Sequence, residues 1–263
     1  QFVTVTEFDA LNRPIAITTP DTNGDRGGSE TLPRYNISGQ LAAITIIADK
    51  QRTLRSTIRE PHYIVRDINY NAKGQRRMIQ FGNDASGEGL RTSLSYDPRT
   101  FRLLNLTTVN KGGVTAYQDL DYAYDPVGNI TAINDSAQQT FYFNNQVVTP
   151  SADYTYDAVY RLLAASGREH KGQNLAPNAW DFHRVGTFNA SCELSRFTNP
   201  GDGAAMRNYT QRYLYDLVGN IEEMIHQAAE GSWRRTYAYE LIQGSRDKRS
   251  NRLISTTVGG ATS

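Results

Sequence analysis

The sequence has a single cysteine and only three methionines among its 263 residues. One cysteine cannot form a disulfide framework or a four-cysteine zinc site, and the four histidines, at positions 62, 170, 183 and 226, do not stand at metal-ligand spacing. No apolar run is long enough to cross a bilayer. Lys and Arg number 28 against 27 Asp and Glu, so the net charge of +1 gives no field that would gather nucleic acid. We therefore expect no metal, no cofactor, no membrane span and no nucleic-acid partner.

Tyrosine and glycine, in contrast, are abundant, with 16 and 21 copies. Both residue types are typical of strands and turns. The segment from Phe2 to Phe8 already consists largely of β-branched and aromatic residues, which predicts a strand. We therefore expect an all-β protein, and we expect this sequence to be a piece of a longer chain that starts in mid-fold.

One short motif recurs along the chain: an aromatic residue, Asp or Asn, two variable residues, Gly or a substitute, a polar residue and usually an aliphatic one. Seven copies start near residues 8, 35, 70, 96, 124, 156 and 215, and the copy at 96 has one extra residue. The period suffices for two strands and two turns, so it predicts repetitive antiparallel β-hairpins. The residues expected to define the repeat turns are Tyr35, Gly39, Tyr70, Gly74, Tyr96, Asp97, Tyr124, Asp125, Gly128, Tyr156, Asp157, Tyr215, Asp216 and Gly219.

The motif has a local physical cause. An Asp or Asn side chain can accept hydrogen bonds from backbone N–H groups ahead of it, and Gly accepts a positive φ, so the pattern describes a type I turn closed by a glycine bulge. Asn12 can take the Gly position because Asn enters the left-handed region at modest cost. Tyr160 cannot do so as easily, and we expect its turn to have another geometry.

The copies are evenly spaced except between residues 156 and 215, where the separation is about twice the others. A degenerate copy or an insertion could fill this stretch. Its Gly, Asn and Pro content favours an inserted loop at about 171–208. We expect a single repeat domain over residues 1–263, in which the hairpins stack into a long curved sheet.

The motif itself resembles a known family. Tyr124–Ile130 reads Tyr-Asp-Pro-Val-Gly-Asn-Ile, and this pattern at this period is similar to the YD, or RHS, repeat of bacterial toxins and teneurins. Together with Ser151–Asp157, Gly167–His170 and Asn251–Leu253, it looks most like the B-component of insecticidal Tc toxin complexes.

The resemblance implies a fold and a role. A strip of β-sheet would form a segment of an RHS-type β-cocoon, or shell, that encloses a toxic polypeptide until it is translocated. It further implies secretion, and the remainder of a larger toxin chain or complex as the partner. Because seven copies are few for the family, we expect an open or partial shell segment.

The chemistry of this family suggests one catalytic site to look for. Members that cleave themselves carry two Asp-Pro-x-Gly elements, and here only Asp125–Gly128 has that form, inside a repeat turn. A carboxylate pair must share one site to split its pKa values, and the sequence names no second partner. We therefore expect no self-cleavage and no enzyme activity.

Other polar clusters have simpler interpretations. Asp21–Gly27 alternates oxygen ligands as a calcium loop does, but Arg26 stands at the required Gly position, so an Asx-rich turn is favoured over calcium. Adjacent strand residues point to opposite faces, so Glu169 and His170 are expected to form a polar strand end. Cys192 is expected to be an inert thiol.

The expected insertion contains four aromatic residues that we expect to pack against another surface, because they are too apolar to be exposed to water: Trp180, Phe182, Phe188 and Phe197. They could pin the loop to the sheet, which we favour, or contact a partner or cargo.

Two functions remain. The first is a non-enzymatic structural module of a toxin shell. The second is an extracellular module that binds carbohydrate or a receptor, since Tyr and Trp stack well on sugar rings. The exposure of the repeat tyrosines distinguishes them, because burial favours the scaffold and a coplanar exposed row favours binding.

Overall fold

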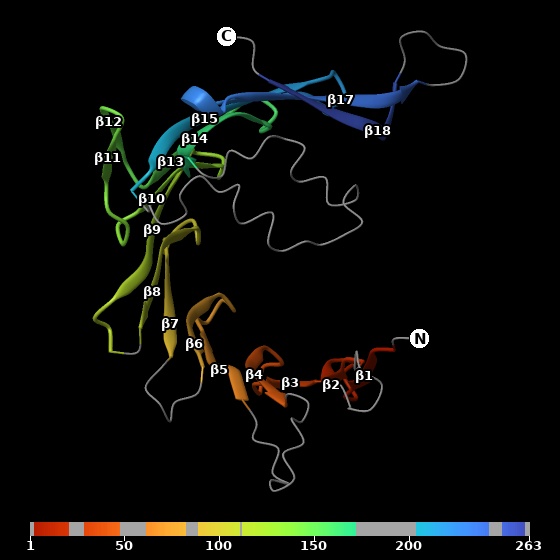
Figure 1. Cartoon of the computed structure of the whole chain (residues 1–263). Helices are drawn as coiled ribbons and strands as arrows, with labels where there is room; N and C mark the ends of the chain where they lie inside the picture. Colours follow the sequence, from red (N-terminus) through yellow and green to blue (C-terminus); the bar gives the residue numbers. More distant parts are fainter. Residues whose placement is uncertain are drawn as a thin grey trace, which may run out of the picture. The chain divides into compact units, whose positions relative to one another are not determined.

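The computed structural model describes residues 3–20, 29–47, 62–82, 89–110, 112–171, 204–241 and 249–260. Almost all regular structure in these ranges is β-strand, with one short 3₁₀-helix (Figure 1). No helix in these ranges is long and apolar enough to cross a membrane. The elements are β1 (Val5–Phe8), β2 (Pro14–Thr18), β3 (Glu30–Tyr35), β4 (Leu41–Ile47), β5 (His62–Tyr70), β6 (Arg76–Phe81), β7 (Leu90–Tyr96), β8 (Leu103–Asn110), β9 (Ala116–Tyr124), β10 (Ile130–Asp135), β11 (Phe141–Phe143), β12 (Gln146–Val148), β13 (Ser151–Tyr156), β14 (Leu162–His170), β15 (Met206–Tyr215), β16 (Ile221–Gln227), η5 (Ala229–Gly231), β17 (Trp233–Leu241) and β18 (Arg249–Gly260).

The strands pair in the order in which they occur along the chain. Sixteen of them form one sheet in which each strand neighbours the next, and β11 pairs only with β12. The pairs from β1–β2 to β7–β8, the pair β10–β13, the pairs from β13–β14 to β17–β18 and the pair β11–β12 are all antiparallel. The prediction of an all-β sheet of repeated antiparallel hairpins is therefore confirmed.

The chain divides into two compact units, residues 1–120 and residues 121–263. The first contains β1 to β8 and the start of β9, and in β7 most residues alternate between an exposed and a more buried face. On the buried face, the hydroxyls of Thr92 and Thr108 lie 2.9 Å apart across β7 and β8. Such a cross-strand pair ties the two strands of a hairpin together without a large apolar core.

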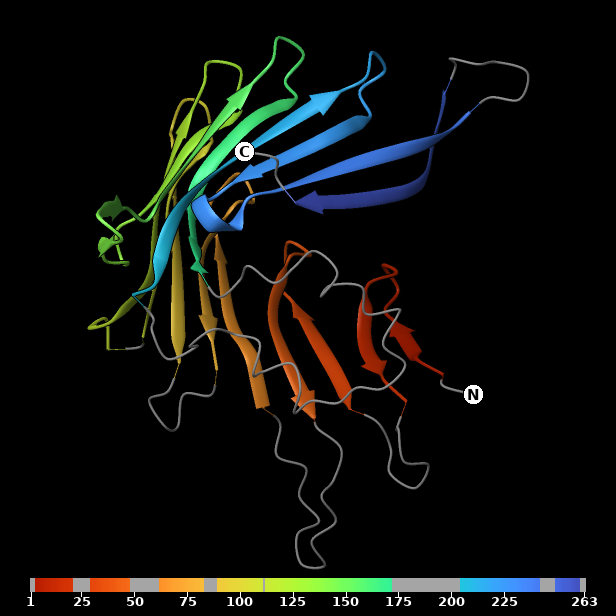
Figure 2. The same cartoon turned by 45° about the horizontal axis from the view of Figure 1, so that its top comes forward.

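The second unit contains the rest of β9 and the strands up to β18, which follow one another side by side (Figure 2). Between β10 and β13 the chain forms the extra β11–β12 hairpin, in which Val148 is fully buried. The amide of Asn208 donates to the carbonyl oxygen of Val147 at 3.0 Å, and Arg168 donates to the carbonyl oxygen of Gln139 at 3.0 Å. These bonds join the hairpin to β14 and β15.

The expected insertion lies between β14 and β15. These strands pair directly from Ala164 with Arg212 to His170 with Met206, so no further hairpin of the sheet stands between them. The inserted loop at about 171–208 stays a prediction. Residues 172–203 lie outside the described ranges, together with Trp180, Phe182, Phe188, Phe197 and Cys192, whereas the last residues of the expected loop, Met206 to Asn208, already belong to β15. The single domain over residues 1–263 stays a prediction.

Burial in the sheet comes mainly from small side chains and half-buried rings. Ala16, Ala43 and Ala165 are buried, as are Val65 and Ile68 of β5, whereas the repeat tyrosines are all of intermediate exposure. In the described ranges only the β11–β12 hairpin and η5 stand outside the sheet. Neighbouring hairpins of the sheet therefore pack mainly against one another. The site described next consists of contacts between such hairpins.

Candidate functional site

Each repeat turn is organised by the Asp or Asn that follows the aromatic residue. The carboxylate of Asp216 accepts hydrogen bonds from the backbone N–H of Val218 at 3.0 Å and of Asn220 at 2.8 Å. The N–H of Asp216 donates to the carbonyl oxygen of Asn220 at 2.9 Å, which closes the hairpin. One side chain thus satisfies two backbone donors that the turn would otherwise leave to water.

The same arrangement recurs in both units. A single side-chain oxygen accepts two backbone N–H groups at Asp9, Asn36, Asn71, Asp97, Asp125 and Asp157. The sequence motif and the turn geometry therefore have the same period.

The residue two places before the closing strand has a positive φ in every described copy of the motif. Gly39, Gly74, Gly128 and Gly219 take this position with φ of 78°, 79°, 114° and 99°. Asn12 takes it at 58°, as expected. In the copy with the extra residue, Phe101 takes it at 61°.

The expectation of a different turn at Tyr160 is wrong. Tyr160 has φ of 67°, and its N–H donates to the carbonyl oxygen of Asp157 at 3.0 Å, as the glycines do in other copies. The carboxylate of Asp157 accepts two backbone N–H groups and lies 2.6 Å from the guanidinium of Arg161. These contacts offset the cost of a left-handed conformation, about 1–2 kcal/mol for a side chain with a Cβ.

The repeat tyrosines connect each hairpin to the one before it. The hydroxyl of Tyr156 donates to the carbonyl oxygen of Ile130 at 2.9 Å, and Ile130 is the first residue after the preceding turn. Five other tyrosines bond the equivalent carbonyl oxygen at 2.7–3.0 Å: Tyr35 to Pro14, Tyr70 to Leu41, Tyr96 to Arg76, Tyr215 to Leu162 and Tyr239 to Ile221. We call this series the tyrosine ladder.

The tyrosine rings are only partly open to solvent. The repeat tyrosines, including Tyr124, are half-buried. Burial raises the pKa of Tyr96, Tyr156 and Tyr215 above the usual value for a phenol. The hydroxyls therefore remain protonated donors well beyond neutral pH, as the ladder requires.

A second series of contacts joins the turns themselves. The polar residue after the positive-φ position reaches the next turn: the Gln75 amide donates to the carbonyl oxygen of Phe101 at 2.8 Å, and Arg161 donates to that of Asp216 at 3.3 Å. Arg161 also lies over the ring of Tyr215, 4.8 Å from its centroid. In these copies the polar residue of the motif therefore links its own turn to the turn of the adjacent copy.

The structure contains one further copy of the motif, beginning at Tyr239, that is not among the seven predicted from the sequence. Tyr239 extends the tyrosine ladder and pairs in register with Leu253, as Tyr215 pairs with Ile221. Asn251 accepts a hydrogen bond from the amide of Asn220 at 3.0 Å, so it takes part in the contacts between turns. The signal was available in Asn251–Leu253, but a longer connection separates it from Tyr239.

Asp125, whose Asp-Pro-x-Gly element resembles the self-cleavage motif, forms hydrogen bonds within its own repeat turn. Asp125 accepts hydrogen bonds from the N–H of Gly128 at 2.7 Å, the N–H of Asn129 at 2.8 Å and the Asn129 amide at 2.7 Å. Partial burial works against ionisation, but these donors lower the pKa of Asp125 below its usual value. The carboxylate is therefore held ionised as an acceptor in the turn.

Metal ligands do not converge in the part of the chain that the structure describes, where no group of three or more His, Cys, Asp or Glu could hold an ion. The calcium-like segment Asp21–Gly27 lies outside the described residues.

A buried charge cluster on β14, β15 and β16 was also missed in the sequence. Glu169 lies opposite Arg207 in the sheet register and accepts a hydrogen bond from its Nε at 2.7 Å. The Nε2 of His226 lies 3.1 Å from the other oxygen of Glu169, and Nδ1 lies 3.3 Å from the amide of Gln211. The β14 strand does end at His170 as expected, but Glu169 is turned to a protected face.

Aromatic rings hold this cluster in place. His226 lies between Tyr209 and Trp233, with ring centroids 5.2 Å and 5.0 Å away. The ring of Tyr209 lies over Gly167, where a Cβ would come within 3.0 Å of the tyrosine hydroxyl. Burial opposes ionisation of Glu169, yet His226 and Arg207 lower the pKa of its carboxyl below the usual value.

Similar proteins place these features in context. Toxin subunit YenC2 of Yersinia entomophaga is 31% identical over 231 residues, which are 86% of this chain and 21% of that protein. Toxin subunit YenC1 of the same organism is 34% identical over 170 residues, 63% of this chain and 15% of that protein. The chain thus spans about a fifth or less of the length of these relatives. No protein-family model matches the sequence.

Solved structures share the fold at lower identity. The crystal structure of TcdB2-TccC3 aligns with 96% of this chain and 10% of that chain, with a TM-score of 0.62 and 26% identity. The structure of the Photorhabdus luminescens Tc holotoxin pore gives the same four values. Together with the repeat turns and the tyrosine ladder, these similarities confirm the resemblance seen in the sequence: the chain is an RHS-repeat component of the Tc toxin family.

Proposed function

We propose that this chain is a segment of the wall of a toxin shell, a non-enzymatic scaffold whose repeats enclose and protect a toxic polypeptide before translocation. The observation that carries the proposal is the tyrosine ladder, found in a chain whose relatives are toxin subunits. Under this proposal the partners are the remainder of a larger toxin chain or complex and the enclosed polypeptide, and the location is extracellular.

A thin wall needs cohesion between neighbouring hairpins. Backbone hydrogen bonds hold strands together, but hairpins stacked without a thick core bury little apolar surface. The hydroxyl of Tyr70, for example, adds a bond of 2.7 Å to Leu41 of the preceding copy, and Gln75 adds one of 2.8 Å to the next turn. Repetition of such contacts lets the sheet grow by one hairpin at a time.

The burial of the tyrosines favours the scaffold over the carbohydrate- or receptor-binding module. A binding surface would offer a coplanar row of exposed rings. The repeat rings are instead half-buried, and six of their hydroxyls bond carbonyl oxygens of the adjacent copy. These rings have less surface and fewer free polar groups for a sugar or receptor.

The test uses the intact toxin component that carries this segment, with a protease-cleavable tag inserted in its enclosed polypeptide. We expect the tag to resist protease in the native component and to be cut after denaturation. The double variant Tyr156→Phe/Tyr215→Phe should increase the native cleavage rate several-fold, because two ladder bonds are lost. Tyr142→Phe is the control, since Tyr142 is 79% exposed. Equal cleavage of the native and denatured parent would show that nothing is enclosed.

A further inference from the structure

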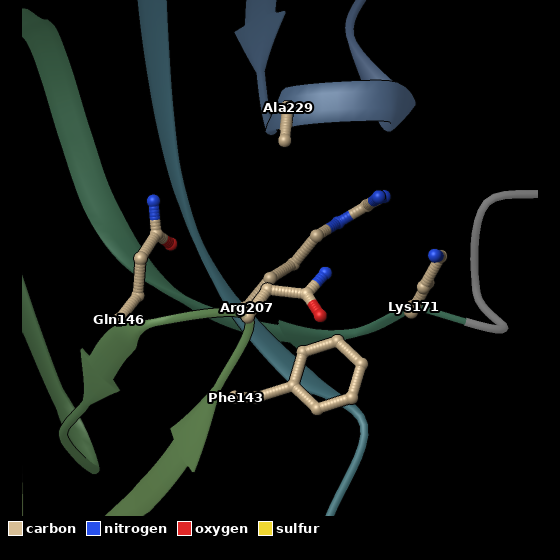
Figure 3. A pocket seen from close by; sticks show the side chains of 6 residues that line it. Phe143, Gln146, Lys171, Arg207 and Ala229 are labelled. Atoms are coloured by element: carbon tan, nitrogen blue, oxygen red, sulfur yellow. The ribbon is translucent and has the colours of Figure 1, made fainter.

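A small pocket opens beside the end of β14, within the second unit. Its volume is about 180 Å³, and its walls come from the β11–β12 hairpin, β15 and η5 (Figure 3). The lining residues are Phe143, Asn144, Gln146, Lys171, Arg207 and Ala229. Among these described residues, two carry a positive charge, two carry an amide and none is acidic.

Arg207 is the most constrained of these side chains. It is 7% exposed, and its Nε is bonded to Glu169. Its Nη2 lies 2.7 Å from the same carboxylate oxygen and is shielded from solvent, so Glu169 faces both Nε and Nη2. A guanidinium that one carboxylate holds at its Nε and Nη2, and that also lines a pocket, has further N–H groups that can donate to an acceptor there.

Glu169 fixes the direction of the guanidinium. Because its carboxylate also lies 3.1 Å from His226, it is held between two partners and keeps Arg207 in one orientation. Figure 3 shows the Arg207 side chain extending toward Ala229, with Lys171 beside it on the same side of the pocket. Two cationic groups therefore flank one small space, and the contact with Glu169 holds one of them, Arg207, in a fixed orientation.

The other walls suit an oxyanion as well. The amides of Asn144 and Gln146 each bring two N–H donors, and Phe143 supplies an apolar wall. Proteins bind carboxylate and phosphate groups with Arg, whose planar guanidinium can donate two parallel hydrogen bonds, and with Lys, whose ammonium group acts as a point charge. We propose that this pocket binds an oxyanion, a carboxylate or phosphate group, held by Arg207 and Lys171.

The experiment measures binding to the intact component by calorimetry at constant ionic strength. The probes are inorganic phosphate and a short end-blocked peptide with two adjacent glutamates. We expect saturable binding of at least one probe, weakened roughly tenfold or more by Lys171→Gln, since a charge-assisted bond is lost. Binding of phosphate alone identifies a free anion as the source, whereas peptide binding displaced by phosphate identifies a polypeptide carboxylate. Both results support the site.

Matched variants keep the test decisive. Arg207→Gln should abolish binding, but it also removes a buried partner of Glu169, so Lys171→Gln carries the test if that variant does not fold. Arg212→Gln is the control, because Arg212 is exposed on the opposite side of the same strand. The proposal is overturned if neither probe binds, or if Lys171→Gln and Arg212→Gln bind as the parent does. The outcome is independent of whether the chain encloses a polypeptide.

Discussion

The hydroxyl of Tyr215 donates to the carbonyl oxygen of Leu162 at 2.8 Å, although 53 residues separate them in the sequence. The strands that carry this contact, β14 and β15, are direct neighbours, so the tyrosine ladder continues although residues 171–205 lie between these strands in the sequence. The hydroxyl of the repeat tyrosine therefore has a role distinct from that of its ring. Phe8, in the first copy, has the ring and lacks the hydroxyl.

Removal of one ladder hydroxyl should loosen two adjacent hairpins. Tyr156→Phe keeps the ring but leaves the carbonyl oxygen of Ile130 without this donor. We expect a loss of about 0.5–1.5 kcal/mol in local stability, the usual net value of one hydrogen bond. Amide hydrogen exchange in the intact component, followed in β10 and β13, should become several-fold faster.

Tyr142→Phe provides the comparison for that experiment, because Tyr142 is 79% exposed on β11. Its exchange pattern should match that of the parent. If Tyr156→Phe also leaves exchange in β10 and β13 unchanged, the ladder bonds do not stabilise the sheet.

The glycine of a repeat turn should be needed for its backbone conformation alone. At Gly219, φ is 99° and an added Cβ would meet no atom within 4 Å. Gly219→Ala should therefore destabilise the β15–β16 hairpin by about 1–3 kcal/mol through strain. Gly259→Ala is the matched control, since that glycine also has open space around its Cβ position but no positive φ. Equal unfolding midpoints for both variants would contradict this assignment.

Gly128→Val should act in the same direction. Gly128 has φ of 114°, and a β-branched side chain is poorly tolerated there. The expected cost is about 1–3 kcal/mol, read as a lower midpoint of urea unfolding or as faster exchange in β9 and β10. An unfolding curve identical to that of the parent would mean that the turn does not need glycine.

At position 160 the native tyrosine is itself strained, so a substitution there should stabilise the turn. Its φ is 67° and its side chain is 59% exposed, so little packing depends on the ring. Tyr160→Asn should raise the stability of the β13–β14 hairpin by about 0.5–1 kcal/mol, since Asn enters the left-handed region at lower cost. Tyr142→Asn, at an exposed strand position without positive φ, should give no gain. A gain in both variants would point to a general effect of removing an exposed ring.

The sequence specified the turns well because their chemistry is local. Asp or Asn, a positive-φ residue and a polar residue lie within five positions, and each contact inside the turn depends on that spacing. Tyr160 was misjudged because the contacts of Asp157 and Arg161 outweigh the preference of a single residue. The pairing of Glu169 with Arg207 and His226 could not be predicted, since it joins three strands and residues 171–205 separate the first two of them in the sequence. Only the register of β14, β15 and β16 brings these side chains together.

Acid should weaken the repeat turns. The N–H groups of Thr100 and Arg99 hold the pKa of Asp97 below its ordinary 3.8. Because the pKa is lower in the folded state, the stabilisation is fully present above about pH 4 and is lost as the pH falls through the folded pKa. Asp97→Asn keeps an acceptor oxygen and does not titrate, so its unfolding midpoint should depend less on pH between about 2 and 5 than that of the parent. Identical pH profiles would show that Asp97 does not contribute to the acid sensitivity.

Loss of the Glu169 carboxylate from the buried cluster should lower the stability of the protein much more than loss of an exposed carboxylate. Glu169→Gln removes the charge that faces both Arg207 and His226, whose side chains are 7% and 4% exposed. Removing one partner of a buried ion pair typically costs about 3–5 kcal/mol, because the remaining charge is left without compensation in a site of low polarity. Glu7→Gln, at an exposed position of β1, should change stability by less than about 0.5 kcal/mol. Urea unfolding of the intact component, with Trp233 fluorescence as the local probe beside His226, should show the early loss in Glu169→Gln alone. If both variants unfold at the same urea concentration, Glu169 does not hold β14, β15 and β16 together.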